Sequence, residues 1–329
     1  MKGLNNTRFI LLQPSSLPTT KPSAASPPPS PIISSHHRLW LLLFLSLFTL
    51  ASLLTLLSTA SNHSQSLSFS PTLATEATRL PSHIFDTLLH YAALVNSSTH
   101  MPEPDMLAIA AVLRRRAPCN MLVFGLGAES PLWRALNHGG RTVFLDENSY
   151  YAEYMEGQHP GLETYDVSYT TQVRDLHDLL ASARESRNSD CRPVQNLLFS
   201  ECRLALNDLP NQLYDVNWDV ILVDGPRGYS PKSPGRMAAI FTASVLARSA
   251  KRDGTTDVMV HDYDREVERM CSEEFLCLEN FREETGTPYL AHYVINGGNA
   301  ARRDTFCSNV KTGEEVEVEV VCAHLKLKV

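Results

Sequence analysis

The sequence predicts an α/β protein built on a doubly wound, mostly parallel sheet. From residue 121 onward, short runs of wholly apolar residues recur, as parallel strands buried on both faces require. Segments with a helical spacing of apolar residues separate these runs. A glycine turn or an acidic residue directly follows several of the runs, which is typical of βαβ units.

The elements follow from local patterns. Two amphipathic helices are expected before the sheet, over residues 88–95 and 106–113, because apolar residues recur there at helical spacing. Proline is tolerated early in a helix, so Ser130-Pro131 opens one helix and Ser233-Pro234 another that runs to about Ala250. The remaining expected elements are strands Met121–Phe124, Thr142–Leu145, Leu162–Tyr169, Val220–Val223, Asp257–Val260 and Ala291–Ile295, with a helix at Val173–Ala183.

An apolar run near the N-terminus predicts a transmembrane anchor at residues 39–59. Its first 19 residues, 39–57, carry no charge and include eleven leucines, which is enough to cross a bilayer as a helix. The preceding residues 1–38 contain cations but no Asp or Glu, so this Pro- and Ser-rich, disordered tail is expected in the cytosol. A cleaved signal peptide is the alternative, but its apolar region is usually shorter and nearer the start.

The rest of the chain would then face a lumen. Residues 60–80 are expected to form a stalk, 81–295 the folded domain and 296–329 a variable tail, whose Glu-Val alternation also suits an edge strand. In an oxidising lumen, two cysteine pairs are close enough in sequence to be considered, Cys271 with Cys277 and Cys191 with Cys202. The sequons at Asn62 and Asn96 would be glycan acceptors.

Charge argues against one class of partner. The net charge is −7, and the only basic block after the anchor is Arg114-Arg115-Arg116, which is expected at a solvated helix end. Proteins that bind nucleic acid usually carry a basic patch or stripe, so nucleic acid is not an expected partner.

A glycine turn followed by an acid predicts a cofactor site. Gly125 and Gly127 let the backbone approach a ligand, and Asp146 or Glu147, about 20 residues on, can accept hydrogen bonds from ribose hydroxyls. Ser130 stands where a dinucleotide motif has its third glycine, so a cofactor without a pyrophosphate, such as S-adenosylmethionine, fits better. The alternative is a tight turn beside a solvated acid.

A second group of polar residues follows two later strands. Asp224, His261 and Asp262 are candidate catalytic residues, because two carboxylates and an imidazole can supply a general base. Asp224 and Asp262 are also candidate ligands of a divalent metal ion, which would lower the pKa of a substrate hydroxyl. The alternative is that they are strand-end polar residues that cap nearby helices.

The loop after Asp224 predicts substrate-binding residues. Arg227, Lys232 and Arg236 can receive an acidic sugar, since arginine binds a carboxylate through two parallel hydrogen bonds. Tyr229 can stack on a sugar ring. Ordinary loop cations and an arginine at a helix start are the alternative. Asp262-Tyr263-Asp264 also matches the Asp-x-Asp pattern of glycosyltransferases, without other support in the sequence.

Several motifs together resemble the plant polysaccharide-biosynthesis (DUF579) family, from about residue 80 to 295. This family contains the glucuronoxylan 4-O-methyltransferases and the irregular-xylem proteins. The motifs that carry the resemblance are Val123-Phe124-Gly125-Leu126-Gly127, Asn196-Leu197-Leu198-Phe199-Ser200-Glu201-Cys202, Trp218 through Gly228, Pro234-Gly235-Arg236-Met237, Val260-His261-Asp262-Tyr263 and Glu273-Glu274-Phe275-Leu276-Cys277.

The resemblance implies a Rossmann-like methyltransferase fold in a Golgi type II membrane protein that is required for xylan biosynthesis in the cell wall. Two activities are compatible with it: an S-adenosylmethionine-dependent 4-O-methyltransferase of glucuronic acid branches on glucuronoxylan, or a non-catalytic scaffold for xylan glycosyltransferases. Asp-Gly-Pro-Arg at 224–227 is similar to the irregular-xylem-fifteen branch, whereas the methyltransferase branch has Asp-Ala-Pro-Thr there. That departure leaves catalysis open.

Overall fold

A computed structural model describes residues 40, 42–53, 79–95, 100–282, 287–301 and 304–308. The chain divides into two units, Met1–Phe69 and Ser70–Val329. In the first unit, residues 42–53 are helical. Within the described ranges, no helix is both long enough and apolar enough to cross a membrane. The predicted tail at 1–38, residues 39, 41 and 54–59 of the predicted anchor, most of the stalk, both sequons and residues 309–329 lie outside the described residues.

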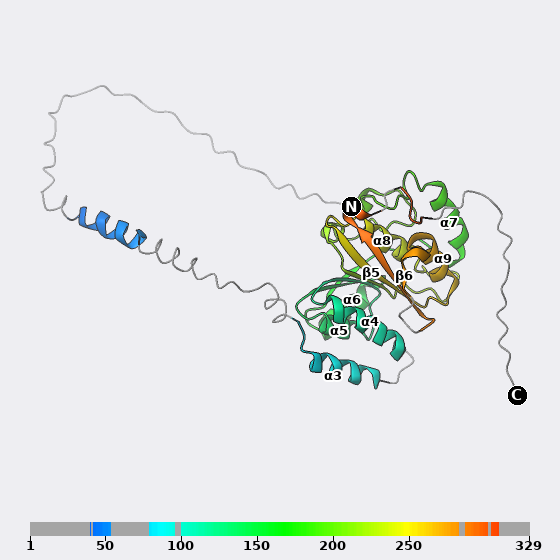
Figure 1. Ribbon diagram of the computed structural model, residues 1–329, viewed down its shortest axis with the longest axis horizontal. Coiled ribbons are helices and arrows are strands. Elements are labelled where there is room, and N and C mark those ends of the chain that lie inside the picture. The colour runs from blue at the N-terminus through cyan, green and yellow to red at the C-terminus, as the bar shows by residue number, and fades with distance from the viewer. Residues whose placement is uncertain are drawn as a thin grey trace, which may run out of the picture. The chain divides into compact units, whose positions relative to one another are not determined.

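The second unit is built on a seven-stranded sheet with the order β3-β2-β1-β4-β5-β7-β6 (Figure 1). The first five strands are parallel to one another, and β7 is antiparallel to both of its neighbours. The predicted mostly parallel, Rossmann-like α/β fold is therefore confirmed. The strands are β1 Asn120–Phe124, β2 Arg141–Asp146, β3 Glu163–Asp166, β4 Val220–Val223, β5 Gly254–His261, β6 Phe281–Arg282 and β7 Leu290–Gly297.

Helices cover both faces of this sheet (Figure 1). One face packs against α3 Ser82–Ala93, α4 Glu103–Arg116, α5 Ser130–Leu136 and α6 Ser149–Gln158. The other packs against α7 Leu176–Glu185, α8 Met237–Arg248 and α9 Glu266–Phe275. Every residue of α8 is buried, which its almost continuous apolar sequence requires.

Local differences from the sequence-based expectation have physical reasons. The third strand is shorter than predicted, because after Asp166 the backbone turns away and Ser168 donates to the Asp208 carboxylate. The helix after Pro234 begins only at Met237, since Gly235 adopts a left-handed φ of 70°. Helix α6 was not predicted; Asn148 caps it by accepting a hydrogen bond from the Tyr151 N–H.

The strand register brings four sequence-distant positions to one edge of the sheet. Phe124 pairs with Leu145 and with Val223, and Val223 pairs with Val260. The residues at or just after these strand ends therefore lie at a common edge, which we call the carboxyl rim: Gly125, Asp146, Asp224 and His261. Strand β7 begins at the same rim, because Leu290 pairs with His261.

Two disulfides fasten the side of the unit that carries α7–α9. The predicted Cys191–Cys202 pair is confirmed. The Cys271–Cys277 pair is wrong: Cys277 bonds to Cys307, while Cys271 is a free, fully buried thiol on α9. The Cys277–Cys307 bond holds Phe306 against the rings of Phe241 and Phe275. Residues 304–308, placed by the sequence in a variable tail, are thus part of the core packing.

Candidate functional site

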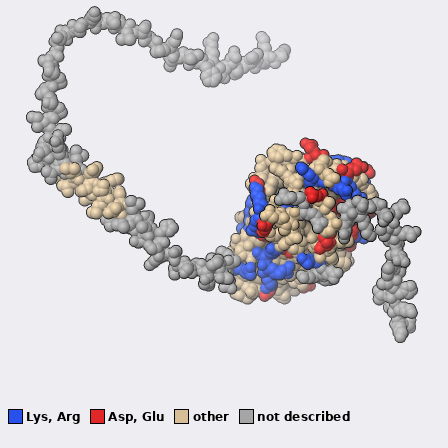
Figure 2. All heavy atoms as spheres, turned by 45° about the horizontal axis from the view of Figure 1, so that its top comes forward, with Lys and Arg blue, Asp and Glu red and all other residues tan. Residues whose placement is uncertain are grey.

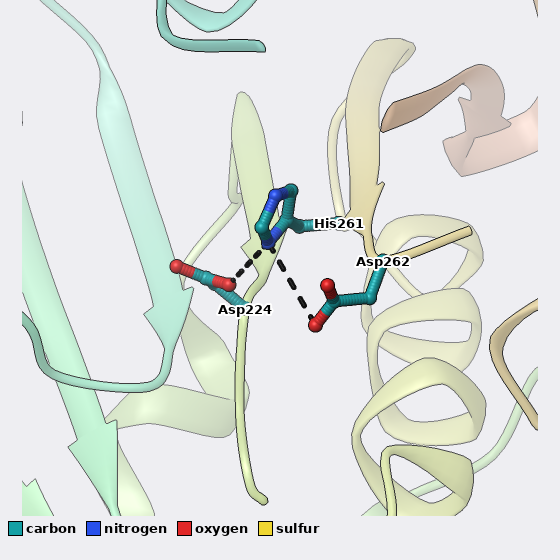
Figure 3. Close-up of side chains that lie close together, drawn as sticks. All are labelled: Asp224, His261 and Asp262. Atoms are coloured by element: carbon teal, nitrogen blue, oxygen red, sulfur yellow. Dashed lines mark hydrogen bonds and ion pairs between the residues drawn. The ribbon is translucent and has the colours of Figure 1, made fainter. Parts of the chain in front are cut away.

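An imidazole lies between carboxylates at the carboxyl rim (Figure 3). His261 Nδ1 lies 2.9 Å from Asp224 Oδ1 and 3.9 Å from Asp262 Oδ2. Asp262 has a left-handed φ of 58°, a conformation that aspartate tolerates better than most residues, and it turns the chain sharply at the end of β5. The structure thus brings together the three residues that the sequence nominated as catalytic.

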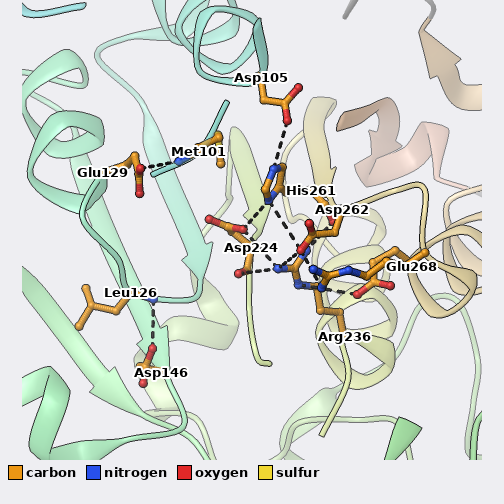
Figure 4. A network of polar contacts seen from close by, with 11 residues as sticks. Met101, Asp105, Leu126, Glu129, Asp146, Asp224, Arg236, His261, Asp262 and Glu268 are labelled. Atoms are coloured by element: carbon orange, nitrogen blue, oxygen red, sulfur yellow. Dashed lines mark hydrogen bonds and ion pairs between the residues drawn. The ribbon is translucent and has the colours of Figure 1, made fainter. Parts of the chain in front are cut away.

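A third carboxylate, that of Asp105, completes this cluster and was missed by the sequence analysis (Figure 4). Its Oδ2 lies 3.1 Å from His261 Nε2, and the residue is fully buried. It belongs to the first turn of α4, where the helix dipole favours a negative charge. Its other oxygen, Oδ1, is buried and has no hydrogen-bond partner in the part of the chain that the structure describes. Both ring nitrogens of His261 are therefore held by carboxylates.

These contacts change the proton affinity of the imidazole. Burial of His261 favours the neutral ring and opposes protonation. The hydrogen bond to Asp224 and the charges of Asp224 and Asp262 outweigh that penalty, so the pKa of His261 is raised above 6.5. The carboxylates thus favour the protonated ring.

Arg236, a predicted substrate-binding residue, lies behind the cluster and is almost completely buried. Its guanidinium donates to the main-chain oxygens of Asp224 and His261 and forms ion pairs with the carboxylates of Asp224 and Asp262, 3.3 and 2.8 Å away. The chain uses these donors internally, which points to a positioning role for Arg236.

A buried acid, Glu268, lies next to Arg236. Its Oε1 is 3.8 Å from Arg236 Nε, and neither of its carboxyl oxygens has a hydrogen-bond partner among the described residues. Burial raises the pKa of Glu268, against the opposing charge of Arg236. Glu268 and Arg236 therefore form a buried charged pair beneath the rim (Figure 4).

The two predicted cofactor glycines have different surroundings. A Cβ on Gly125 would lie 2.9 Å from the main chain of both Asp224 and Gly225, so this glycine lets the β1 and β4 loops touch. A Cβ on Gly127 would meet only Glu129 Oε2, at 3.4 Å. Gly127 therefore leaves backbone open for a ligand, whereas Gly125 is required by packing.

Asp146, the predicted ribose acceptor, is buried beside the glycine turn. Its two oxygens accept hydrogen bonds from the N–H groups of Leu126 and Asn148, at 3.1 and 2.9 Å. Desolvation raises the pKa of Asp146, although these two bonds oppose the shift. The structure thus joins Asp146 to the glycine turn, as the sequence spacing predicted.

The remaining predicted residues are Glu147, Arg227 and Tyr229, and the first two form an ion pair. Glu147 pairs with Arg227, with Oε1 2.8 Å from Nε, so a predicted cofactor residue and a predicted substrate residue bind each other. The hydrogen bond and charge of Glu147 raise the pKa of Arg227. Tyr229, in the same loop, is largely exposed.

A pocket of about 470 Å³ opens beside the imidazole cluster. Gly127, Asp224, His261 and Asp262 line it, so one predicted cofactor glycine faces the three predicted catalytic residues. Its other walls are His100, Met101, Pro102, Glu129, Asp264, Arg265 and Tyr289. A larger cavity of about 820 Å³ lies between α7, α9 and residues 304–308, away from these groups.

Hydrogen bonds and ion pairs also join polar residues that line this pocket. Glu129 Oε1 accepts a hydrogen bond from the Met101 N–H at 2.8 Å and lies 3.1 Å from His100 Nδ1 (Figure 4). Asp262 forms a further ion pair with Arg265 at 2.8 Å. Figure 2 shows positively and negatively charged side chains scattered among uncharged residues on one face of the unit.

Comparisons with known proteins relate the chain to a family of plant proteins. The model of a family described as IRX15/IRX15L/GXM matches residues 104–293. From Arabidopsis thaliana, Protein IRX15-LIKE is 50% identical and Protein IRREGULAR XYLEM 15 is 49% identical; the alignments cover 89% of this chain and 91% and 92% of those proteins. Glucuronoxylan 4-O-methyltransferase 2 of the same plant is 40% identical over 72% of this chain and 80% of its own length.

Proposed function

The chain belongs to the IRX15/IRX15L/GXM family, and on that basis we propose that its folded unit is a methyltransferase-like domain that supports xylan biosynthesis in the plant cell wall. As an enzyme, it would transfer a methyl group from S-adenosylmethionine to a hydroxyl of a glucuronic acid branch, as the name of one relative suggests. The observation that carries this proposal is the single pocket in which Gly127 faces Asp224, His261 and Asp262.

The glycine turn and Asp146 fit the cofactor. S-Adenosylmethionine supplies an electrophilic methyl group on a sulfonium. Gly127 has almost no atom where a Cβ would stand, so its backbone is open to the cofactor. Asp146 is fixed by two N–H donors and keeps further lone pairs for ribose hydroxyls.

The imidazole cluster would handle the proton of the acceptor hydroxyl. As the hydroxyl oxygen would take the methyl group from the sulfonium, the cofactor would leave as its neutral thioether, and the O–H proton would pass to the Asp224 carboxylate, which the His261 ring holds through Nδ1. Asp105 holds Nε2 and so keeps Nδ1 directed at Asp224 and the pocket. The Arg236 guanidinium donates hydrogen bonds to the main-chain oxygens of Asp224 and His261 and so fixes the strand ends that carry these two residues.

A metal ion does not fit this arrangement without a rearrangement. Asp224, His261 and Asp262 offer ligand atoms within 4.8 Å of one another. The Arg236 guanidinium, however, already pairs with both carboxylates and supplies positive charge there. An ion would have to displace it, so we derive no step through a metal.

Cofactor binding is the first test. Titration calorimetry of the full-length protein with S-adenosylmethionine should give saturable binding, and Gly127→Trp should abolish it by filling the open backbone. Gly157→Trp is the matched control, because a Cβ on Gly157 has no atom within 4 Å. No heat of binding at millimolar cofactor would rule out the proposal. Transfer of a labelled methyl group to glucuronoxylan oligosaccharides would then establish catalysis.

A second candidate function, a non-catalytic scaffold for xylan glycosyltransferases, is favoured by one observation. Partners within the chain already bind the two predicted substrate-binding arginines, Arg227 and Arg236. They also bind both ring nitrogens of His261. Complementation of a xylan-deficient plant with the double variant Asp224→Ala, His261→Ala separates the two candidates. Full rescue favours the scaffold, and failure at normal protein abundance favours catalysis.

We also propose that the domain lies in the Golgi lumen, as a type II membrane protein. The two disulfides support this location, because such bonds persist in oxidising compartments and are rare in the cytosol. Protease protection of the domain in intact Golgi vesicles, with glycosidase-sensitive glycans at Asn62 or Asn96, is the expected result. Digestion without detergent would place the domain in the cytosol.

A further inference from the structure

Exposed aromatic side chains are unevenly distributed over the folded unit. Among the residues that the structure describes in Ser70–Val329, six aromatic side chains are strongly exposed. Tyr91 lies on α3 and Phe199 in a short 3₁₀ turn. The other four lie on segments that adjoin the carboxyl rim, Tyr150 and Tyr154 on α6, Tyr229 after β4 and Tyr289 before β7, with exposed fractions of 84, 59, 74 and 47%. Isolated exposed aromatics are ordinary, but a gathering at one edge requires an explanation.

Their order along the rim follows the order of the strands. Tyr150 and Tyr154 occupy successive turns of α6, which follows β2. Tyr229 lies in the loop after β4, and Tyr289 directly precedes β7. From β2 to β7 the sheet crosses four interstrand spacings, about 19 Å, long enough for several sugar rings. The imidazole cluster, at the ends of β4 and β5, lies between Tyr229 and Tyr289 in this order.

Contacts on the rim hold the tyrosines in place. The Glu147–Arg227 ion pair ties the segment before α6 to the loop of Tyr229. Tyr154 stacks on Tyr151, with ring centroids 6.4 Å apart and an interplanar angle of 19°. The Tyr289 carbonyl accepts a hydrogen bond from the Tyr263 N–H at 2.9 Å. Binding would therefore require little ordering of these segments.

We propose that Tyr150, Tyr154, Tyr229 and Tyr289 form a track on which a linear chain of pyranose rings lies across the carboxyl rim. The proposal rests on the proposed function and extends it from the pocket to the polymer. An aromatic ring can pack against the C–H face of a pyranose while the hydroxyls of both groups stay in water. A branch sugar midway along the bound chain would reach the pocket at Asp224 and His261.

Charge fits a xylan with acidic branches. Arg227 exposes 61% of its side chain and has guanidinium donors beyond the Nε that binds Glu147. A carboxylate on a branch beside Tyr229 can accept hydrogen bonds from these donors. Arg265, at the wall of the pocket near Tyr289, offers a second cation. The track therefore suits a neutral backbone that carries uronic acid branches.

The test is calorimetric titration of the full-length protein with xylohexaose. We expect Tyr150→Ala, Tyr154→Ala, Tyr229→Ala and Tyr289→Ala each to weaken binding about 3- to 10-fold. Tyr→Phe at the same positions should restore most of the affinity, because the ring face remains. Tyr91→Ala and Phe199→Ala are matched controls, exposed by 65 and 76% but away from the rim, and should bind like the wild type.

Three results would overturn the track. The first is no binding of xylohexaose at millimolar concentration. The second is an equal loss of xylohexaose affinity in the control variants. The third is a loss of S-adenosylmethionine affinity in the Tyr150 and Tyr154 variants while glycan binding is unchanged. The last result would assign these tyrosines to the cofactor. Glycan binding that depends on the tyrosines in a protein that does not bind the cofactor would instead leave the track standing and refute the methyltransferase proposal.

Discussion

His261 joins Asp105 and Asp224 through opposite nitrogens of one ring, at 3.1 and 2.9 Å. The three residues come from helix α4 and from the ends of β5 and β4, so the imidazole ties a helix outside the sheet to its carboxyl rim. A ring held at both nitrogens cannot rotate without breaking a charge-assisted bond. The orientation of His261 is thus set before any ligand arrives.

This arrangement predicts a pH-dependent contribution to stability. The folded state raises the pKa of His261 above its unfolded value, so protonation of the ring stabilises the fold. That stabilisation is complete below about pH 6.5 and is lost as the pH rises through the folded pKa. The difference in unfolding free energy between wild type and His261→Gln, measured in urea from pH 5.5 to 8.5, should therefore shrink with increasing pH. A difference that grows with pH would contradict the charge assignment.

Asp105→Ala should be strongly destabilising. It removes the carboxylate that binds His261 Nε2 in a buried, charge-assisted contact. The loss of this contact should lower the unfolding free energy by about 2–4 kcal/mol. Asp86→Ala is the matched control, because it breaks an exposed ion pair with Arg114 and should cost less than about 1 kcal/mol. Equal effects in chemical denaturation would show that the buried contact contributes little.

The two glycines of the β1 turn should respond differently to one methyl group. Gly125→Ala forces a Cβ against the Asp224–Gly225 backbone at a φ of 107°, and we expect a loss of about 2–4 kcal/mol. Gly127→Ala meets only a flexible carboxylate, so its stability should stay within about 1 kcal/mol of the wild type. Thermal unfolding of both variants measures this, and similar melting temperatures would refute the distinction.

Removal of Arg236 should create a cation site. In Arg236→Gln the carboxylates of Asp224 and Asp262 lose their shared guanidinium, so affinity for Mn²⁺ should rise about tenfold or more. Arg265→Gln, which removes an ion pair to Asp262 alone, should change affinity less. Paramagnetic resonance of Mn²⁺ titrations reports both, with circular dichroism to check folding. Tight Mn²⁺ binding by the wild type would show that the guanidinium does not exclude the ion.

Loss of the Cys277–Cys307 bond should destabilise the fold more than loss of Cys191–Cys202. The first spans 30 residues and the second 11, and the loop-closure entropy removed from the unfolded chain grows with loop length. Paired Cys→Ala variants should cost about 2–4 kcal/mol, with the larger value for the longer loop. Non-reducing peptide mapping checks the pairing, and a Cys271–Cys277 peptide would overturn it.

The sequence alone predicted six of the seven strands, all but β6, and most of the rim. Four-residue apolar runs identify the buried strands, and parallel strands place their carboxyl ends together, so the order of residues along the chain is enough to group Asp146, Asp224 and His261. The sequence analysis missed Asp105, because Asp105 and His261 are 156 positions apart in the chain. Its signal was present nonetheless: it lies four and seven residues before Ile109 and Val112, on the buried stripe of α4, where a charge needs a partner.

The roles of the cations were harder to predict. Sequence shows that Arg227 and Arg236 follow Asp224 in one loop, but not that one is exposed and pairs with Glu147 while the other is buried behind Asp262. Both pairings are set by how β2, β4 and β5 are placed in the sheet. Local composition carries no information on such long-range partners.

The Cys277–Cys307 disulfide holds Phe306 in the core, and this limits how far the protein can be shortened for recombinant production. A fragment that stopped at residue 295 would uncover the rings of Phe241 and Phe275 and leave Cys277 as an unpaired thiol. Such a fragment would be prone to intermolecular crosslinking and precipitation. Secretion vectors should therefore extend at least to Ser308.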